Sequence, residues 1–292
     1  MPYTEQFLEY IAGQRGYSPH TVDAYGLDLE QFKRSLRKSL LKASPHDIRK
    51  HVARCLARGQ SAQTASRKLS CIRSFYQFVF MEGGLPRNPA RHIRKPKVPQ
   101  TIVRPTTGKE VDAMLASLEA DTPLLIRDRA LLYVAYGSGL RASELANLRI
   151  GDLDFPNGVA KVRLGKGKKD RLVPMNQREM EALTLWLDKG RPQFAREPDN
   201  GHVFIGYRYG WAMTRQRLWQ VTTAISADVL GRGVSPHKFR HAFVTETING
   251  GADIRVVQQM AGHASINTTR RYLHFDFERL RSQYLKAHPR GA

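Results

Sequence analysis

The sequence predicts a mainly α-helical protein of two domains with one small β-sheet or hairpin, and three observations support this. Apolar residues recur at helical spacing over most of the 292 residues, and the period changes only near residue 160. A stretch rich in proline and basic residues interrupts the pattern near residue 100. The 41% of hydrophobic residues is ordinary for a folded chain. This pattern favours two separately folded cores.

The first domain shows three helical segments with start and stop signals. Ser18 and Pro19 open a segment whose apolar residues recur every three or four positions, and Ser44 with Pro45 opens a second. A third segment runs from about 61 to 82 and ends at a Gly-Gly pair, which tolerates the backbone that ends a helix. We therefore expect residues 1–86 to form a small helical domain.

Residues 87–106 contain four prolines and six Lys or Arg residues. Proline at this density allows neither a helix nor a central strand, so the sequence predicts an interdomain linker. The second domain is then expected over residues 107–292.

The second domain reads mainly as helices. We expect them near 107–119 and 123–137, within GLRASELANL, near 176–189 and 212–229, and then from Pro236, Asp253, Ser265 and about Asp276. Between 158 and 174 the spacing favours two strands around a Gly- and Lys-rich turn. That segment predicts a β-hairpin with a basic tip.

The net charge of +21 is spread over both domains. Residues 1–100 hold 18 basic and 7 acidic residues, and residues 101–292 hold 29 and 19. Two basic folded halves suit a clamp around a polyanion better than a basic tail would, and nucleic acid is the leading partner. An anionic membrane surface is the weaker alternative, and the sequence has neither a membrane span nor a secretory signal. With its two cysteines lacking metal spacing, the chain is expected in the cytoplasm.

Several familiar motifs are excluded by their spacing. GKGKKD at 165–170 lacks the Ser or Thr of a phosphate loop, and YGSGL at 136–140 is not a serine-hydrolase elbow. His237 and His241 have zinc-ligand spacing, but the glutamate of HExxH is missing and Arg240 would repel a cation. We therefore expect no metal and no cofactor.

What remains is a group of polar side chains suited to a phosphodiester. Guanidinium groups bind phosphate oxygens and stabilise the charge that develops as a nucleophile adds. A tyrosine can attack phosphorus if a histidine accepts its proton, and a lysine on a mobile hairpin can protonate the departing oxygen. The candidate residues are Arg141, Lys166, His237, Arg240, His263 and Tyr272.

The strings GLRASEL, GKGKKDRLVP, SPHKFRHAFVT and MAGHASINTTRRY, with YSPHTVDAYGLDLEQF near the start, resemble the tyrosine recombinase (phage integrase) family, especially its Xer-type members. The resemblance implies a SAM-like helical core-binding domain and a catalytic domain that close as a clamp on duplex DNA. It also implies that Tyr272 is the nucleophile, forming a 3′-phosphotyrosyl link, and that Arg141, Lys166, His237, Arg240 and His263 assist it. The expected activity is site-specific recombination through a Holliday junction, as in the resolution of chromosome or plasmid multimers.

Ordinary interpretations stay open for each residue taken alone. Arg141 could pair with Glu144, Lys166 could be solvated, His237 and His263 could lie at helix ends, and Tyr272 could be a half-buried aromatic. For the whole chain the alternatives are a mobile-element integrase, a type IB topoisomerase and a DNA-binding architectural protein whose site is idle.

The C-terminal segment predicts an amphipathic helix over 276–287. Phe277, Leu280 and Tyr284 share one of its faces. By the family resemblance, this helix docks on a neighbouring subunit in a homo- or hetero-tetramer on DNA, the latter with a second recombinase. Packing of the same face on its own domain is the alternative.

Overall fold

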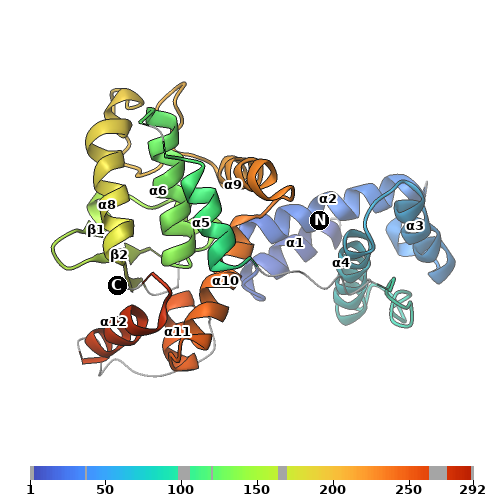
Figure 1. Ribbon diagram of the computed structural model, residues 1–292. Coiled ribbons are helices and arrows are strands. Elements are labelled where there is room, and N and C mark those ends of the chain that lie inside the picture. Colours follow the sequence, from blue (N-terminus) through green and yellow to red (C-terminus); the bar gives the residue numbers. More distant parts are fainter. Residues whose placement is uncertain are drawn as a thin grey trace. The chain divides into compact units, whose positions relative to one another are not determined.

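The computed structural model describes residues 3–36, 38–97, 106–119, 121–163, 170–262 and 275–290, and for 275–279 the backbone only. It divides into two compact units, Met1–Ile102 and Val103–Ala292, joined through the proline-rich stretch. The fold class expected from the sequence is confirmed: helices dominate, and the described strands form one small sheet (Figure 1).

The N-terminal unit is a bundle of four α-helices and one short 3₁₀ turn. The helices are α1 (Tyr3–Gly13), α2 (Pro19–Leu36), α3 (Pro45–Ala57) and α4 (Ala62–Met81), and the 3₁₀ turn spans Leu40–Lys42. The three helices expected from capping signals are present, and α1 is an additional one. Its Phe7 and Ile11 side chains are buried against the same core as α4.

Capping explains where two of these helices begin. Ser44 accepts a hydrogen bond from the backbone N of Asp47, and the Asp47 carboxylate accepts one from the backbone N of Ser44. The Ser61 side chain accepts from the backbone N of Thr64 at the start of α4. These bonds satisfy backbone donors that a helix start leaves unpaired.

The C-terminal unit is built around α6 (Pro123–Gly137), which is flanked by α5 (Gly108–Ala116) and α8 (Gln177–Leu185), as Figure 1 shows. A π-helical turn, Trp186–Gly190, extends α8. The helix expected near 176–189 is therefore present, as an α-helix followed by this turn. Trp186 is fully buried and its indole N–H donates to the carbonyl oxygen of Val203 at 2.8 Å. The largest hydrophobic cluster among the described residues forms here.

The described part of this unit contains further helices and two 3₁₀ turns. They are α7 (Ala142–Ala146), α9 (Arg215–Leu230), α10 (Pro236–Asn249), α11 (Ile254–Ala261), α12 (Phe275–Ala287) and 3₁₀ turns at Ile150–Asp152 and Arg191–Gln193. The helix expected from 212 begins at Arg215, after its Thr214 cap. The helix expected from Ser265 lies outside the described residues. No helix in the described part of the chain combines the length and apolar character that crossing a bilayer requires.

The sheet is antiparallel, in the order β1 (Leu153–Asp154), β2 (Val159–Val162), β3 (Arg171–Pro174). Strands β2 and β3 form the expected hairpin, with Val162 opposite Arg171. Strand β1 was not expected, because two residues are too few to show an alternating pattern.

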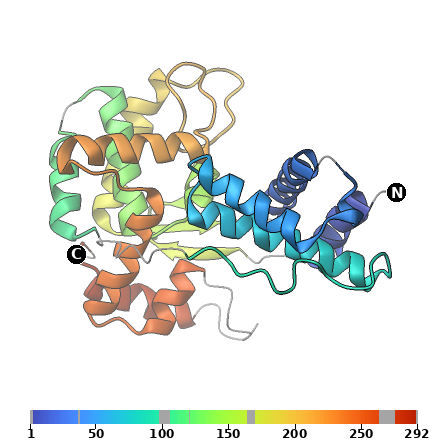
Figure 2. The same cartoon turned by 90° about the vertical axis from the view of Figure 1, so that its right-hand side faces the viewer.

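Helices α11 and α12 lie together with α10 in both views (Figure 2). A separate hydrophobic cluster joins them, in which Phe243, Met260, Leu280 and Tyr284 are buried. The face of α12 that carries Leu280 and Tyr284 therefore packs on its own unit. The side chain of Phe277 lies outside the described residues.

Candidate active site

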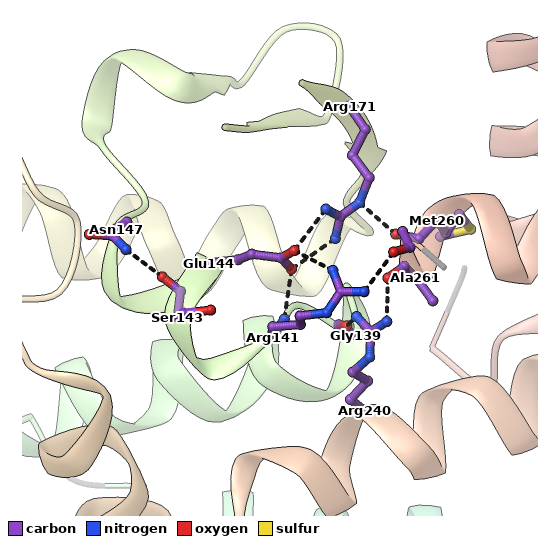
Figure 3. Close-up of polar contacts among 10 residues, drawn as sticks. Gly139, Arg141, Ser143, Glu144, Asn147, Arg171, Arg240, Met260 and Ala261 are labelled. Atoms are coloured by element: carbon purple, nitrogen blue, oxygen red, sulfur yellow. Dashed lines mark hydrogen bonds and ion pairs between the residues drawn. The ribbon is translucent and has the colours of Figure 1, made fainter. Parts of the chain in front are cut away.

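Three arginine side chains from different elements meet at the C-terminal end of α11 (Figure 3). The carbonyl oxygens of residues 260–262 accept, in chain order, one hydrogen bond each from Arg171, Arg240 and Arg141. The bonds from Arg171 and Arg141 measure 2.9 and 2.6 Å. These carbonyls form the negative end of the α11 dipole, so cations are stabilised there.

A tight turn brings Arg141 to this place. Gly139 has a φ of +57°, and a Cβ atom at this position would collide with the Phe243 ring. Only glycine adopts this backbone without strain and leaves space for the ring. The chain then enters α7, where Arg141 is the residue before the first helical position.

Glu144 on α7 holds Arg141 through its buried carboxylate. Arg141 donates to it twice, from its backbone N at 2.8 Å and from Nη1 at 2.7 Å. Arg171 adds a two-point contact, with Nη1 and Nη2 at 2.9 and 2.8 Å from the two carboxylate oxygens. Burial alone would raise the pKa of Glu144, but the hydrogen bonds from Arg171 and Arg141 outweigh it and lower the pKa to about 2. Glu144 is therefore ionised at neutral pH.

Arg240 on α10 is almost fully buried, at 5% exposed. Its Nη1 donates to the carbonyl oxygen of Gly139 at 2.7 Å, which ties α10 to the turn before Arg141. Burial, and then the charge of Arg141, lowers the pKa of Arg240 to about 10. The guanidinium stays charged at neutral pH, so the like charges of Arg141, Arg171 and Arg240 share a small region next to the end of α11.

His237 lies in the first turn of α10 and is exposed. It precedes Arg240 by three positions on this helix, but its side chain is exposed whereas that of Arg240 is buried. Lys166, His263 and Tyr272 lie outside the described residues. Gly262, in a left-handed conformation with φ of +63°, ends α11 directly before His263 in the chain.

The structure therefore brings together two of the six candidates, Arg141 and Arg240. It also adds Glu144 and Arg171, which were not among the candidates. Pairing of Arg141 with Glu144 was the ordinary interpretation of Arg141, and the ion pair is present. It does not exclude a role in binding, because the same guanidinium also reaches the end of α11. Arg171 stands in the string GKGKKDRLVP, whose position in the hairpin gives no sign of its partners.

Among the described residues, no three His, Cys, Asp or Glu side chains gather in a way that could hold a metal ion. The charges at the end of α11 come from arginines and one glutamate. This set can bind an anion such as a phosphodiester through charge-assisted hydrogen bonds.

Two family descriptions match the chain and cover most of it. Residues 104–279 match the "Phage integrase family", and residues 4–83 match "Phage integrase, N-terminal SAM-like domain". The second match lies within the N-terminal helical unit.

Curated relatives match over nearly the full length. The chain is 37% identical to tyrosine recombinase XerD of Yersinia pestis, covering 99% of this chain and 98% of that protein. It is 36% identical to tyrosine recombinase XerC of Myxococcus xanthus, with coverages of 99% and 98%.

Solved structures show the same fold. The crystal structure of XerA recombinase aligns with a TM-score of 0.51 at 27% identity, covering 99% of this chain and 100% of that one. The Tn1549 transposon integrase, solved in complex with circular intermediate DNA, aligns with a TM-score of 0.71 at 21% identity, covering 96% and 98%.

Proposed function

We propose, from the premise that this chain belongs to the phage integrase family of tyrosine recombinases, that it is a site-specific recombinase that cleaves and rejoins duplex DNA. One observation carries the proposal furthest. Arg141 and Arg240, from separate helices, place their guanidinium groups at the end of α11, directly before His263 in the chain. This is the charge arrangement that a scissile phosphodiester needs.

The two arginines would bind the phosphate in place of the backbone carbonyls they now contact. A phosphodiester carries one negative charge, and more charge develops on its oxygens as the nucleophile adds. Planar guanidinium groups donate to two oxygens at once and keep their charge when buried. We propose that this clamp supplies the electrostatic stabilisation without a metal ion, so cleavage should persist in excess EDTA.

Tyr272 would be the nucleophile. Its phenolic oxygen attacks phosphorus, His237 accepts its proton, and the bond to the 5′ oxygen of the next nucleotide breaks. Lys166 gives that oxygen a proton, and His263 helps to hold the phosphate. The product is a 3′-phosphotyrosyl link, which a 5′ hydroxyl of the partner strand opens in the reverse step. Two such exchanges, with a Holliday junction between them, complete recombination.

The surface near α9 favours DNA as the partner. From residue 200 to residue 227 the sequence has no Asp or Glu and carries Arg208, Arg215 and Arg217. Trp211 and Trp219 in the same segment are 72% and 50% exposed. Arginine and exposed aromatic groups together are typical of nucleic-acid surfaces. We propose that residues 1–86 and 107–292 hold the duplex from two sides, with 87–106 as the linker.

We further propose a tetramer on two DNA sites, formed by this chain alone or with a second recombinase. Leu280 and Tyr284 pack on their own unit, so the described arrangement of α12 is that of a single subunit. Docking of helix 276–287 on a neighbour would then accompany assembly on DNA. Sedimentation should give a monomer without DNA and four subunits per two sites with it.

The biological role that fits best is Xer-like resolution of chromosome or plasmid multimers in the cytoplasm. The alignments with relatives named XerC and XerD span 98% of the length of those proteins, at 36 to 37% identity. This similarity favours the resolution of multimers over integration of a mobile element. The likeness to the transposon integrase supports the fold alone.

A plasmid assay tests the proposal. A site is first selected by the protein from random-sequence DNA, and supercoiled plasmids then carry two, one or no copies of it. A recombinase excises the segment between two directly repeated sites and leaves the site-free plasmid supercoiled. Relaxation of all three plasmids without excision would instead identify a topoisomerase.

A further inference from the structure

Arg171 is the first residue of β3, and its side chain is turned inward. The side chain is only 11% exposed and makes hydrogen bonds with all three nitrogen atoms of its guanidinium group. Nη1 and Nη2 bind Glu144, and Nε binds the carbonyl oxygen of Met260. With this geometry each nitrogen atom of the Arg171 guanidinium already has a partner within the protein.

The partners of Arg171 belong to parts of the site that are far apart in sequence. Glu144 lies 27 residues before it and Met260 lies 89 residues after it. The first orients Arg141 by accepting from its backbone and side chain. Met260 is the second-last residue of α11, at the end of the helix where Arg141 and Arg240 also bind. One guanidinium therefore links the sheet, α7 and α11 (Figure 3).

Charge balance gives Arg171 a second role. Glu144 is buried and ionised. If it were paired with Arg141 alone, its negative charge would cancel the positive charge with which Arg141 attracts a phosphate. Because Arg171 contributes another positive charge to the same carboxylate, the group of Arg141, Arg171 and Glu144 keeps a net charge of about +1 by formal counting. Arg141 can then act as a cation toward DNA while Glu144 still orients it.

We infer that Arg171 is a positioning residue of the recombination site, which fixes Glu144, and through it Arg141, against the end of α11. This inference rests on the proposed function. It predicts that Arg171 affects the rate of strand cleavage and not the affinity for DNA, because a buried side chain contacts no phosphate.

The test measures formation of the covalent protein–DNA product on a nicked substrate, in a single turnover with saturating DNA. Arg171→Met should lower the rate constant by about 100-fold, the loss that a misplacement of roughly 1 Å causes at a reacting centre. Its dissociation constant for the site should stay within about twofold of wild type. Arg171→Lys keeps the charge but lacks the planar fork, so about a tenfold loss is expected. If Arg171→Met fails to fold, the lysine variant carries the comparison.

Arg163→Met is the matched control. Arg163 follows β2 in the same hairpin and pairs with the buried carboxylate of Asp152 at 2.7 Å, but neither residue contacts α7 or α11 through a hydrogen bond among those described. This variant also removes the arginine partner of a buried carboxylate in the C-terminal unit, so it should lose stability without losing the cleavage rate. If Arg163→Met lost as much cleavage rate as Arg171→Met, the loss in both would be explained by lower stability. That result would overturn the inference.

A double variant distinguishes positioning from an independent contribution. If Arg171 acts through Glu144, then Glu144→Gln together with Arg171→Met should cleave within about threefold of Glu144→Gln alone, as expected for coupled residues. Losses that multiply would overturn the inference. If wild type and Arg171→Met formed the covalent product at the same rate, the inference would also be overturned, but the proposed function would still hold. No covalent product from the wild type would instead refute the proposed function.

Discussion

The hydroxyl group of Tyr284 holds α12 against the core of the C-terminal unit, and the loss of stability on its removal can be worked out from its hydrogen bonds. Tyr284 is fully buried. Its oxygen accepts from Asn176 Nδ2 at 2.9 Å, and its single proton is shared between the Gly137 carbonyl at 3.0 Å and a Glu179 oxygen at 3.1 Å. Tyr284→Phe removes one donated and one accepted hydrogen bond and keeps the ring.

The expected loss follows from these two bonds. The donated bond contributes about 1 kcal/mol, and the buried Asn176 amide left without this acceptor costs about 1–3 kcal/mol. The variant should therefore lose about 2–4 kcal/mol of unfolding free energy, a large part of the roughly 5–15 kcal/mol of a typical domain.

Tryptophan fluorescence in urea reports unfolding of the C-terminal unit, because this unit contains all three tryptophans, Trp186, Trp211 and Trp219. The midpoint should fall while the slope with urea stays unchanged. Tyr133→Phe is the control. The Tyr133 ring is covered by Arg290, and its hydroxyl makes no hydrogen bond within the described residues, so its change should stay within about 0.5 kcal/mol. A loss below about 1 kcal/mol in Tyr284→Phe, or an equal loss in both variants, would show that the hydrogen bonds of the Tyr284 hydroxyl do not stabilise this unit.

Two further predictions concern the same core. Burial raises the pKa of Glu179 to about 8, although Ser138, the backbone of Asn176 and Tyr284 donate to it. The folded state therefore holds a proton that the unfolded state releases, and stability falls as pH rises from about 5 to about 8, by about 1.4 kcal/mol per unit. Urea titrations across this range should show that slope as the difference between wild type and Glu179→Gln, and a constant difference would contradict it. Gly139→Ala meets both a positive φ and the Phe243 ring. It should cost about 2–4 kcal/mol, from left-handed strain and overpacking, and slow cleavage; a variant as stable and active as wild type would show that the turn relaxes freely.

Local signals predicted most of the helices correctly. Ser18 with Pro19 and Ser44 with Pro45 mark helix starts in the sequence, and both helices begin where these signals stand. The helix Tyr3–Gly13 was not predicted, because its short apolar face shows no capping signal at its start. The sheet was predicted as a hairpin of β2 and β3, and the additional strand β1 is too short for a recognisable pattern.

The site was predictable only in part, because its organisation depends on contacts between distant residues. The types and spacing of Arg141 and Arg240 already indicate a phosphate clamp. Arg171 looks in the sequence like any basic residue beside a turn, and only the fold brings it to Glu144 and Met260. The apolar face of α12 predicts that something covers it, and the structure identifies the cover as the core around Phe243.

The central claim is that Tyr272 becomes covalently joined to DNA, and one measurement tests it directly. The purified protein is incubated with a nicked substrate that carries its selected site and releases a short fragment after cleavage, so that rejoining is blocked. A denaturing gel then separates free protein from the covalent product. We predict a product with wild type that is absent with Tyr272→Phe, while both proteins bind the site equally. Binding by the wild type without any product would favour an idle DNA-binding protein, and a product that persists in Tyr272→Phe would show that another residue is the nucleophile.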